Sequence, residues 1–83
     1  MKLSRIGMSI VRDVLAYQGT RQSVQQEALD KIAERKVFYG TDDIATIVHV
    51  GADYGWSKKC AKDEADKTRG AKLALLRALG MRG

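Results

Sequence analysis

The sequence predicts a single small α+β domain over residues 1–83, and three observations lead to this fold class. Apolar residues recur at helical spacing up to about residue 36, β-branched residues gather between 44 and 50, and leucines follow a helical pattern near the end. The chain is 45% hydrophobic and 30% charged, which is typical of a globular domain and not of a disordered chain. An all-α helix-turn-helix bundle is the alternative fold.

The first predicted element is an amphipathic helix over residues 3–17. Glycine readily leaves helical geometry, so Gln18-Gly19-Thr20 is expected to end this helix. The apolar stripe of the helix is formed by Leu3, Ile6, Ile10, Val14 and Tyr17, and Val11 widens it.

The second predicted element is a helix that runs to about Lys36. Ser23 and Gln26 have the spacing of a capping box, in which each side chain satisfies a backbone N–H that the new helix leaves unpaired. The expected buried stripe is Ala28, Leu29, Ile32 and Ala33. This face is thin, so the helix needs a packing partner.

Residues 37–39 and 44–50 predict two extended segments around a polar turn, forming a short β-hairpin. The second segment is rich in Ile, Val and Thr, which favour strands over helices. In the alternative, Thr41 caps a helix that buries Ile44, Ile47 and Val48, and residues 51–55 form the turn of a helix-turn-helix.

After Gly55 the helical pattern returns, and Gly70 is expected to break or kink this last segment. Residues 71–79 then bring leucines to the core before Gly80 ends the helix. The leucines are Leu73, Leu75, Leu76 and Leu79.

Charge and cysteine usage narrow the classes of partner. Fifteen Lys and Arg against ten Asp and Glu give a net charge of +5, which favours anionic partners. The single cysteine cannot form an intrachain disulfide, and no zinc-binding spacing occurs, so a reducing cytoplasm is expected. No segment has the continuous apolar core of a signal peptide or a membrane span. Because so short a chain buries a modest core, a homodimer is an open option.

Two groups of residues are candidates for contacting a partner. A basic set at a predicted helix start near Ser57 offers cations and a positive helix end to phosphates, although three acids among these residues also fit an ordinary solvated face. Tyr54 and Trp56, on either side of Gly55, can stack on bases or fill a partner's pocket; alternatively, Trp56 packs beneath the following helix. The basic set is Lys58, Lys59, Lys62, Lys67, Arg69 and Lys72.

Catalytic and metal-binding patterns are weak. His49 and Cys60 are the only candidates for a base and a nucleophile, and a structural role for each fits a lone His in an apolar run and a lone Cys. Asp42, Asp43 and Asp53 lack the ligand spacing of a calcium loop and are better explained by turn chemistry. We therefore expect a non-enzymatic protein that uses no cofactor and no metal.

Two local resemblances bear on function. The run Ser57-Lys58-Lys59-Cys60-Ala61-Lys62, followed by Ala65, is similar to the start of the last helix in double-stranded RNA-binding domains, which implies phosphate contacts for Lys58, Lys59 and Lys62. That family has three strands before this helix, whereas the sequence predicts two. The C-terminal third looks like the ending of many small bacteriophage proteins, with Ala65 in place of an aromatic and Ala71 in place of a basic residue. The matching residues are Cys60-Ala61-Lys62-Asp63, Gly70-Ala71-Lys72-Leu73-Ala74 and Arg77-Ala78-Leu79.

The functional prediction is a small phage-type accessory protein of the host cytoplasm that binds nucleic acid, with Tyr54 or Trp56 at the margin of the contact. The alternative is a protein-binding inhibitor of a host or defence complex, such as an anti-CRISPR protein or an inhibitor of the transcription machinery, in which Tyr54 and Trp56 anchor an acidic or nucleic-acid-handling partner. No membrane contact is expected. The predicted nucleic-acid contacts are Lys58, Lys59, Lys62 and Arg69.

Overall fold

A computed structural model describes residues 2–58 and 67–81, and within them four antiparallel strands form one sheet in the order β1-β2-β3-β4. The strands are β1 (Ser4–Ile6), β2 (Val37–Thr41), β3 (Ala45–Val50) and β4 (Asp53–Lys58), and the helices are α1 (Met8–Ala16), α2 (Gln22–Ile32) and α3 (Lys67–Ala78). A short 3-10 turn, η1 (Tyr17–Gly19), follows α1. The predicted α+β class is confirmed.

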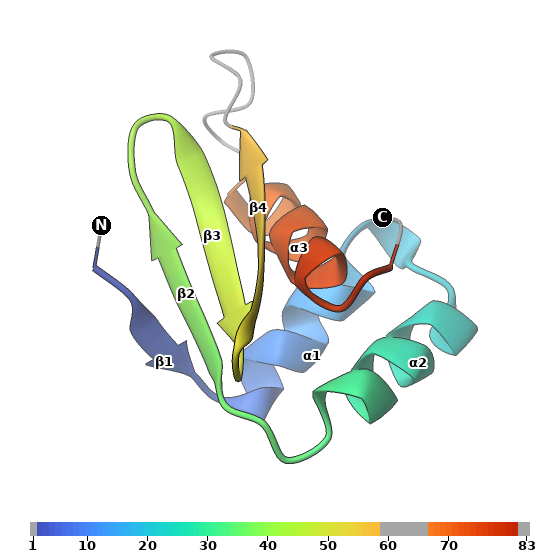
Figure 1. Cartoon of the computed structure of the whole chain (residues 1–83). Helices are drawn as coiled ribbons and strands as arrows, with labels where there is room; N and C mark the ends of the chain where they lie inside the picture. The colour runs from blue at the N-terminus through green and yellow to red at the C-terminus, as the bar shows by residue number, and fades with distance from the viewer. Residues whose placement is uncertain (1, 59–66, 82–83) are drawn as a thin grey trace.

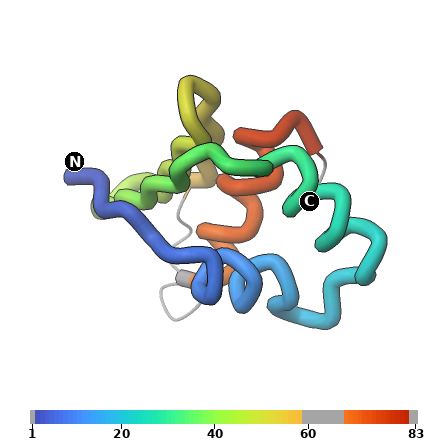
Figure 2. Tube along the Cα trace, turned by 90° about the horizontal axis from the view of Figure 1, so that it is seen from below, coloured from blue at the N-terminus to red at the C-terminus, as the bar shows by residue number. Residues whose placement is uncertain are grey.

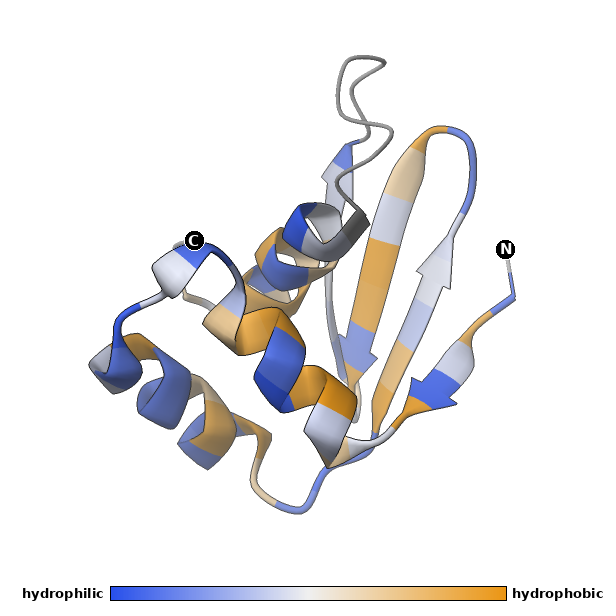
Figure 3. Ribbon diagram, turned by 180° about the vertical axis from the view of Figure 1, so that it is seen from behind, coloured by the Kyte–Doolittle hydropathy of each residue, from blue (hydrophilic) through white to orange (hydrophobic). Residues whose placement is uncertain are grey.

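The sheet and the helices form two layers (Figure 1). Helix α3 packs against β3 and β4 and also contacts α1, and Figure 2 shows it between the strands and α1. Seen from behind, in Figure 3, the three helices of the described residues lie on the same side of the sheet. In the part of the chain that the structure describes, no helix covers the other face of the sheet.

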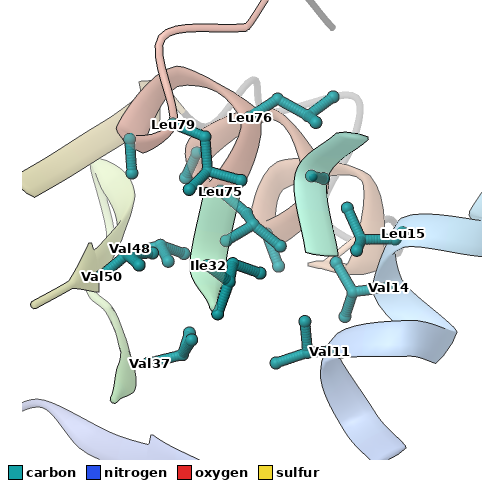
Figure 4. Close-up of a cluster of buried hydrophobic side chains, with 14 residues drawn as sticks. Val11, Val14, Leu15, Ile32, Val37, Val48, Val50, Leu75, Leu76 and Leu79 are labelled. Atoms are coloured by element: carbon teal, nitrogen blue, oxygen red, sulfur yellow. The ribbon is translucent and has the colours of Figure 1, made fainter. Parts of the chain in front are cut away.

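One hydrophobic cluster lies between the layers (Figure 4). It joins Val11 and Leu15 of α1, Ile32 of α2, Val48 of β3 and Leu75 of α3, each nearly or fully buried. Burial of side chains of this size stabilises the fold by about 1.5–3 kcal/mol each.

None of the helices in the described ranges has the length and apolar character that crossing a lipid bilayer requires.

The N-terminal segment differs from the prediction. Residues 4–6 are a strand, and α1 begins only at Met8, so a helix over residues 3–17 is wrong at its start. Leu3 and Ile6 fit a helical stripe by spacing, but Ile6 instead pairs with Val37 of β2 and packs on the core. Because that pairing joins residues far apart in the sequence, local periodicity does not reveal it. Ile10, expected in the stripe, is 50% exposed.

Helix α2 also has different ends. It begins at Gln22 with Arg21 as an N-cap that makes no side-chain bond, so the predicted capping box of Ser23 and Gln26 is wrong. The helix stops at Ile32 instead of Lys36, because Ala33 leaves helical geometry with a positive φ of +51°. Of the predicted stripe, Ala28 and Ile32 are fully buried, Leu29 is half-buried and Ala33 is exposed.

The predicted hairpin is confirmed as β2 and β3, and the alternative helix through residues 44–48 is wrong. Thr46, Val48 and Val50 share the buried face, as period-2 alternation requires. The hairpin belongs to a larger sheet, however, because residues 53–58, predicted as turn and helix start, are strand β4.

The last helix runs through Gly70 without interruption, so the expected break there is wrong. Leu75, Leu76 and Leu79 are buried, as predicted, while Leu73 is half-buried. Gly80 has φ +72° and ends the helix, and the Met81 amide donates to the Leu76 carbonyl at 2.8 Å. This is the bonding of a Schellman motif.

Candidate functional site

Strand β4 presents two aromatic side chains to solvent. Tyr54 and Trp56 are 61% and 52% exposed, whereas the intervening Gly55 and the following Ser57 are buried. Successive side chains of a strand point to opposite faces, so Tyr54, Trp56 and Lys58 share the sheet face opposite the described helices. The interpretation of Trp56 as a side chain packed beneath the following helix is therefore wrong.

The packing of α3 on β4 determines which residues face outward. A Cβ atom added to Gly55 would lie 2.3 Å from both the Ala74 carbonyl oxygen and the Ala78 amide nitrogen, so only glycine allows this approach. Two residues on, the buried Ser57 hydroxyl donates to the Gly70 carbonyl at 2.8 Å. With Gly55 and Ser57 held against the helix, the pleat turns Tyr54 and Trp56 away from it.

The neighbouring strands extend this surface. In the strand register Arg5, Phe38, His49 and Tyr54 lie side by side across the four strands, and Ile47 lies beside Trp56. The His49 and Tyr54 rings are stacked, with centroids 5.6 Å apart and planes inclined by 25°. We call this surface the open face; its strand positions are Arg5, Phe38, Gly40, Ala45, Ile47, His49, Tyr54, Trp56 and Lys58.

The charged strand positions of the open face all have one sign. Its strand positions include the cations Arg5 and Lys58 and no carboxylate. Asp53, the one acid within the four strands, pairs with Val50 on the opposite-facing row and forms an ion pair with Arg35 at 2.6 Å. A cationic, aromatic surface of this kind attracts anionic groups and offers flat rings for stacking.

A shallow depression lies at the edge of the open face. It has a volume of about 420 Å³ and is lined by Tyr54, Gly55, Trp56 and Arg77. Arg77 reaches it from α3, and its Nη1 donates to the Trp56 carbonyl oxygen at 2.8 Å. This hydrogen bond satisfies a backbone carbonyl at the free edge of the sheet. It also fixes the guanidinium group beside Tyr54 and Trp56.

The predicted basic contacts are only partly brought together. Lys58 is exposed at the end of β4, so Ser57 and Lys58 are strand residues and not the start of a helix. Arg69 is exposed near the start of α3, next to Gly70. Lys59 and Lys62 lie outside the described residues.

Lys72 is not available to a phosphate. Its Nζ donates to the Tyr17 carbonyl oxygen at 3.0 Å and to the Thr20 hydroxyl oxygen at 2.8 Å, in a partly buried position. The cation thus satisfies the carbonyl of the residue that caps the C-terminus of α1, and it ties α3 to the chain between α1 and α2. Its role in this structure is structural.

The candidate catalytic and metal groups take part in other interactions. Asp42 Oδ1 accepts from the backbone amides of Ile44 and Ala45 at 2.7 and 2.8 Å, which closes the turn between β2 and β3. His49 stacks on Tyr54, and Cys60 lies outside the described residues, so the structure does not test whether the two lie together, and the expectation of a non-enzymatic protein stays a prediction. Over residues 2–58 and 67–81, no three His, Cys, Asp or Glu side chains are placed to hold a metal ion.

The sequence did not point to Arg5 and Phe38 as members of the open face, or to Arg77 as a residue of the depression at its edge. One signal was present: Tyr54-x-Trp56-x-Lys58 alternates with small or polar residues, a period-2 pattern that indicates a strand with one exposed face.

Comparisons with protein-family models, with curated proteins and with solved structures find no match.

Proposed function

We propose that this protein is a non-enzymatic nucleic-acid-binding protein and that the open face is its binding surface. The observation that supports it is the exposure of Tyr54 and Trp56 on one face of β4, together with Lys58. Large exposed aromatic side chains are unusual on a surface that contacts only water, and beside cations they are suited to nucleotides.

Electrostatics favours an anionic partner, and the exposed aromatic rings beside the cations favour nucleic acid among such partners. The chain has a net charge of +5, and the strand positions of the open face carry Arg5 and Lys58 without any acid. Phosphates meet such cations by releasing counterions, which makes the affinity depend steeply on salt. In the phage setting implied by the C-terminal resemblance, the protein would act on nucleic acid in the host cell.

The test is a titration of labelled single-stranded DNA, single-stranded RNA and their duplexes, followed by fluorescence anisotropy at several salt concentrations. Trp56 is the only tryptophan, so quenching of intrinsic fluorescence reports contact at the site itself. We expect the logarithm of the association constant to fall linearly with the logarithm of the salt concentration. We also expect Trp56→Ala to lose affinity. Ile10→Ala, an exposed apolar residue on α1, is the matched control and should bind as the wild type does.

Absence of binding to every nucleic acid at low salt would overturn the proposal. In that case, capture of a protein partner with affinity nearly independent of salt would favour the inhibitor alternative, with Tyr54 and Trp56 as its anchors.

A further inference from the structure

We infer that the ligand of the open face is single-stranded and that one unpaired base enters the depression between Tyr54 and Trp56. This inference rests on the proposed function and specifies the class of nucleic acid that the same surface takes. It depends on the spacing of the two aromatic residues, the position of Arg77 and the row of rings across the sheet.

The spacing of Tyr54 and Trp56 suits a flat ring between them. Residues two apart on a strand have Cα atoms about 7 Å apart, and a base in contact with two flat neighbours needs about 3.5 Å on each side. Gly55 lies between them in the chain and adds no side chain to the depression, which has a volume of about 420 Å³. An inserted base would therefore contact both aromatic side chains.

Arg77 supplies polar contacts at the wall of this depression. One guanidinium nitrogen donates a hydrogen bond to the Trp56 carbonyl oxygen at 2.8 Å. This bond fixes the position of the guanidinium group, which helix α3 carries. A guanidinium has five N–H donors, so others stay available for a base edge or a phosphate. No ion pair of Arg77 with a carboxylate occurs in the part of the chain that the structure describes.

A row across the sheet continues the site beyond the first base. The register places Tyr54, His49, Phe38 and Arg5 next to one another on four adjacent strands, so the row spans roughly 15 Å. His49 and Tyr54 are already stacked. A chain of nucleotides laid along this row meets rings over three strands and a cation at its far end.

A duplex cannot use these features, because its bases are stacked on one another and their faces are hidden. Side chains read duplex bases at their edges, within grooves that admit a helix or a two-stranded ribbon. Aromatic rings on an open sheet reach bases only where these are unstacked, as in single strands. The same face thus selects against paired nucleic acid.

The experiment measures the anisotropy of labelled oligonucleotides of about 12 nucleotides, single-stranded or annealed to their complement, with the full chain, two variants of Trp56 and one variant of Arg77. Trp56→Phe keeps a flat aromatic ring. Trp56→Leu keeps an apolar side chain but has no ring. Trp56 is 52% exposed, so neither variant disturbs the core. Circular dichroism verifies that each variant is folded.

We expect single strands to bind at least about 10-fold more tightly than the duplex, and Trp56→Leu to lose about 5- to 100-fold in affinity while Trp56→Phe loses much less. Arg77→Met should also weaken single-strand binding. Equal or tighter duplex binding, or equal affinities of Trp56→Leu and Trp56→Phe, would overturn the inference and leave the proposed function standing. Binding to neither form would overturn both.

Discussion

Replacing Gly55 with alanine tests whether the close contact between β4 and α3 holds the candidate site in place. The added Cβ would lie 2.3 Å from the Ala74 carbonyl oxygen and from the Ala78 amide nitrogen, whereas ordinary contact begins at 3.4 Å. Both obstacles are backbone atoms, so no side chain can rotate away. The strand must therefore move away from the helix by about 1 Å.

The free energy of unfolding should fall by about 3 kcal/mol. Overpacking at a rigid interface costs about 1–3 kcal/mol, and retreat of the strand also stretches the 2.8 Å hydrogen bond from Ser57 to Gly70, worth about 1 kcal/mol. In a domain of this size each kcal/mol lowers Tm by about 4–8 °C, so a fall of about 12 °C or more is expected. Urea unfolding followed by circular dichroism measures the loss directly.

Gly70→Ala is the matched control, since it adds the same methyl group to the same helix–sheet interface. There the nearest atom, the Thr46 hydroxyl oxygen, is 3.4 Å away, which is ordinary contact. Alanine is also the better helix former by about 1 kcal/mol, so this variant should match or exceed the wild type in stability. A Gly55→Ala protein within about 1 kcal/mol of the wild type, or equal losses in both variants, would refute the reasoning.

Four further variants, with Arg12→Met as a control, probe the polar contacts and the charge of Lys58. Lys72→Met removes two hydrogen bonds of a partly buried ammonium and should cost about 2 kcal/mol in a urea titration, while Arg12→Met, at an exposed position on α1, should change stability by less than about 0.5 kcal/mol. Lys58→Met should lower the salt slope of nucleic-acid binding by about 1, and the same slope in Lys58→Met as in Arg12→Met would contradict a phosphate contact. Asp53→Asn breaks an exposed ion pair and should cost less than about 1 kcal/mol; Arg35→Met should cost more, because its guanidinium also donates to the Lys31 and Val50 carbonyls.

Elements whose signal is local were predicted well. The β-branched run at 45–50 is a strand, and Leu75, Leu76 and Leu79 are buried on a helix that Gly80 ends. These patterns depend on side-chain preferences and periodicity within a few residues, so neighbouring sequence is enough to reveal them.

The two edge strands were missed for a shared reason. β1 has three residues, and in β4 the strand-favouring Tyr54 and Trp56 alternate with Asp53 and Gly55, which are poor strand formers. Each becomes a strand by pairing with β2 or β3, and β4 also because Gly55 admits α3. Long-range backbone pairing of this kind overrides local preference.

The candidate site divides in the same way. Tyr54, Trp56 and Lys58 were identified from residue type and charge, because aromatic rings and ammonium groups carry their chemistry wherever they lie. Their common face, the row from Arg5 to Tyr54 and the contribution of Arg77 follow only from strand register and from the packing of α3. Sequence alone thus determined which chemical groups this protein possesses. It also located strand β3 and the end of helix α3, since the signals for these two elements lie within neighbouring residues. Tertiary structure decided which groups stand together in solvent, since that depends on hydrogen bonds and contacts between distant segments.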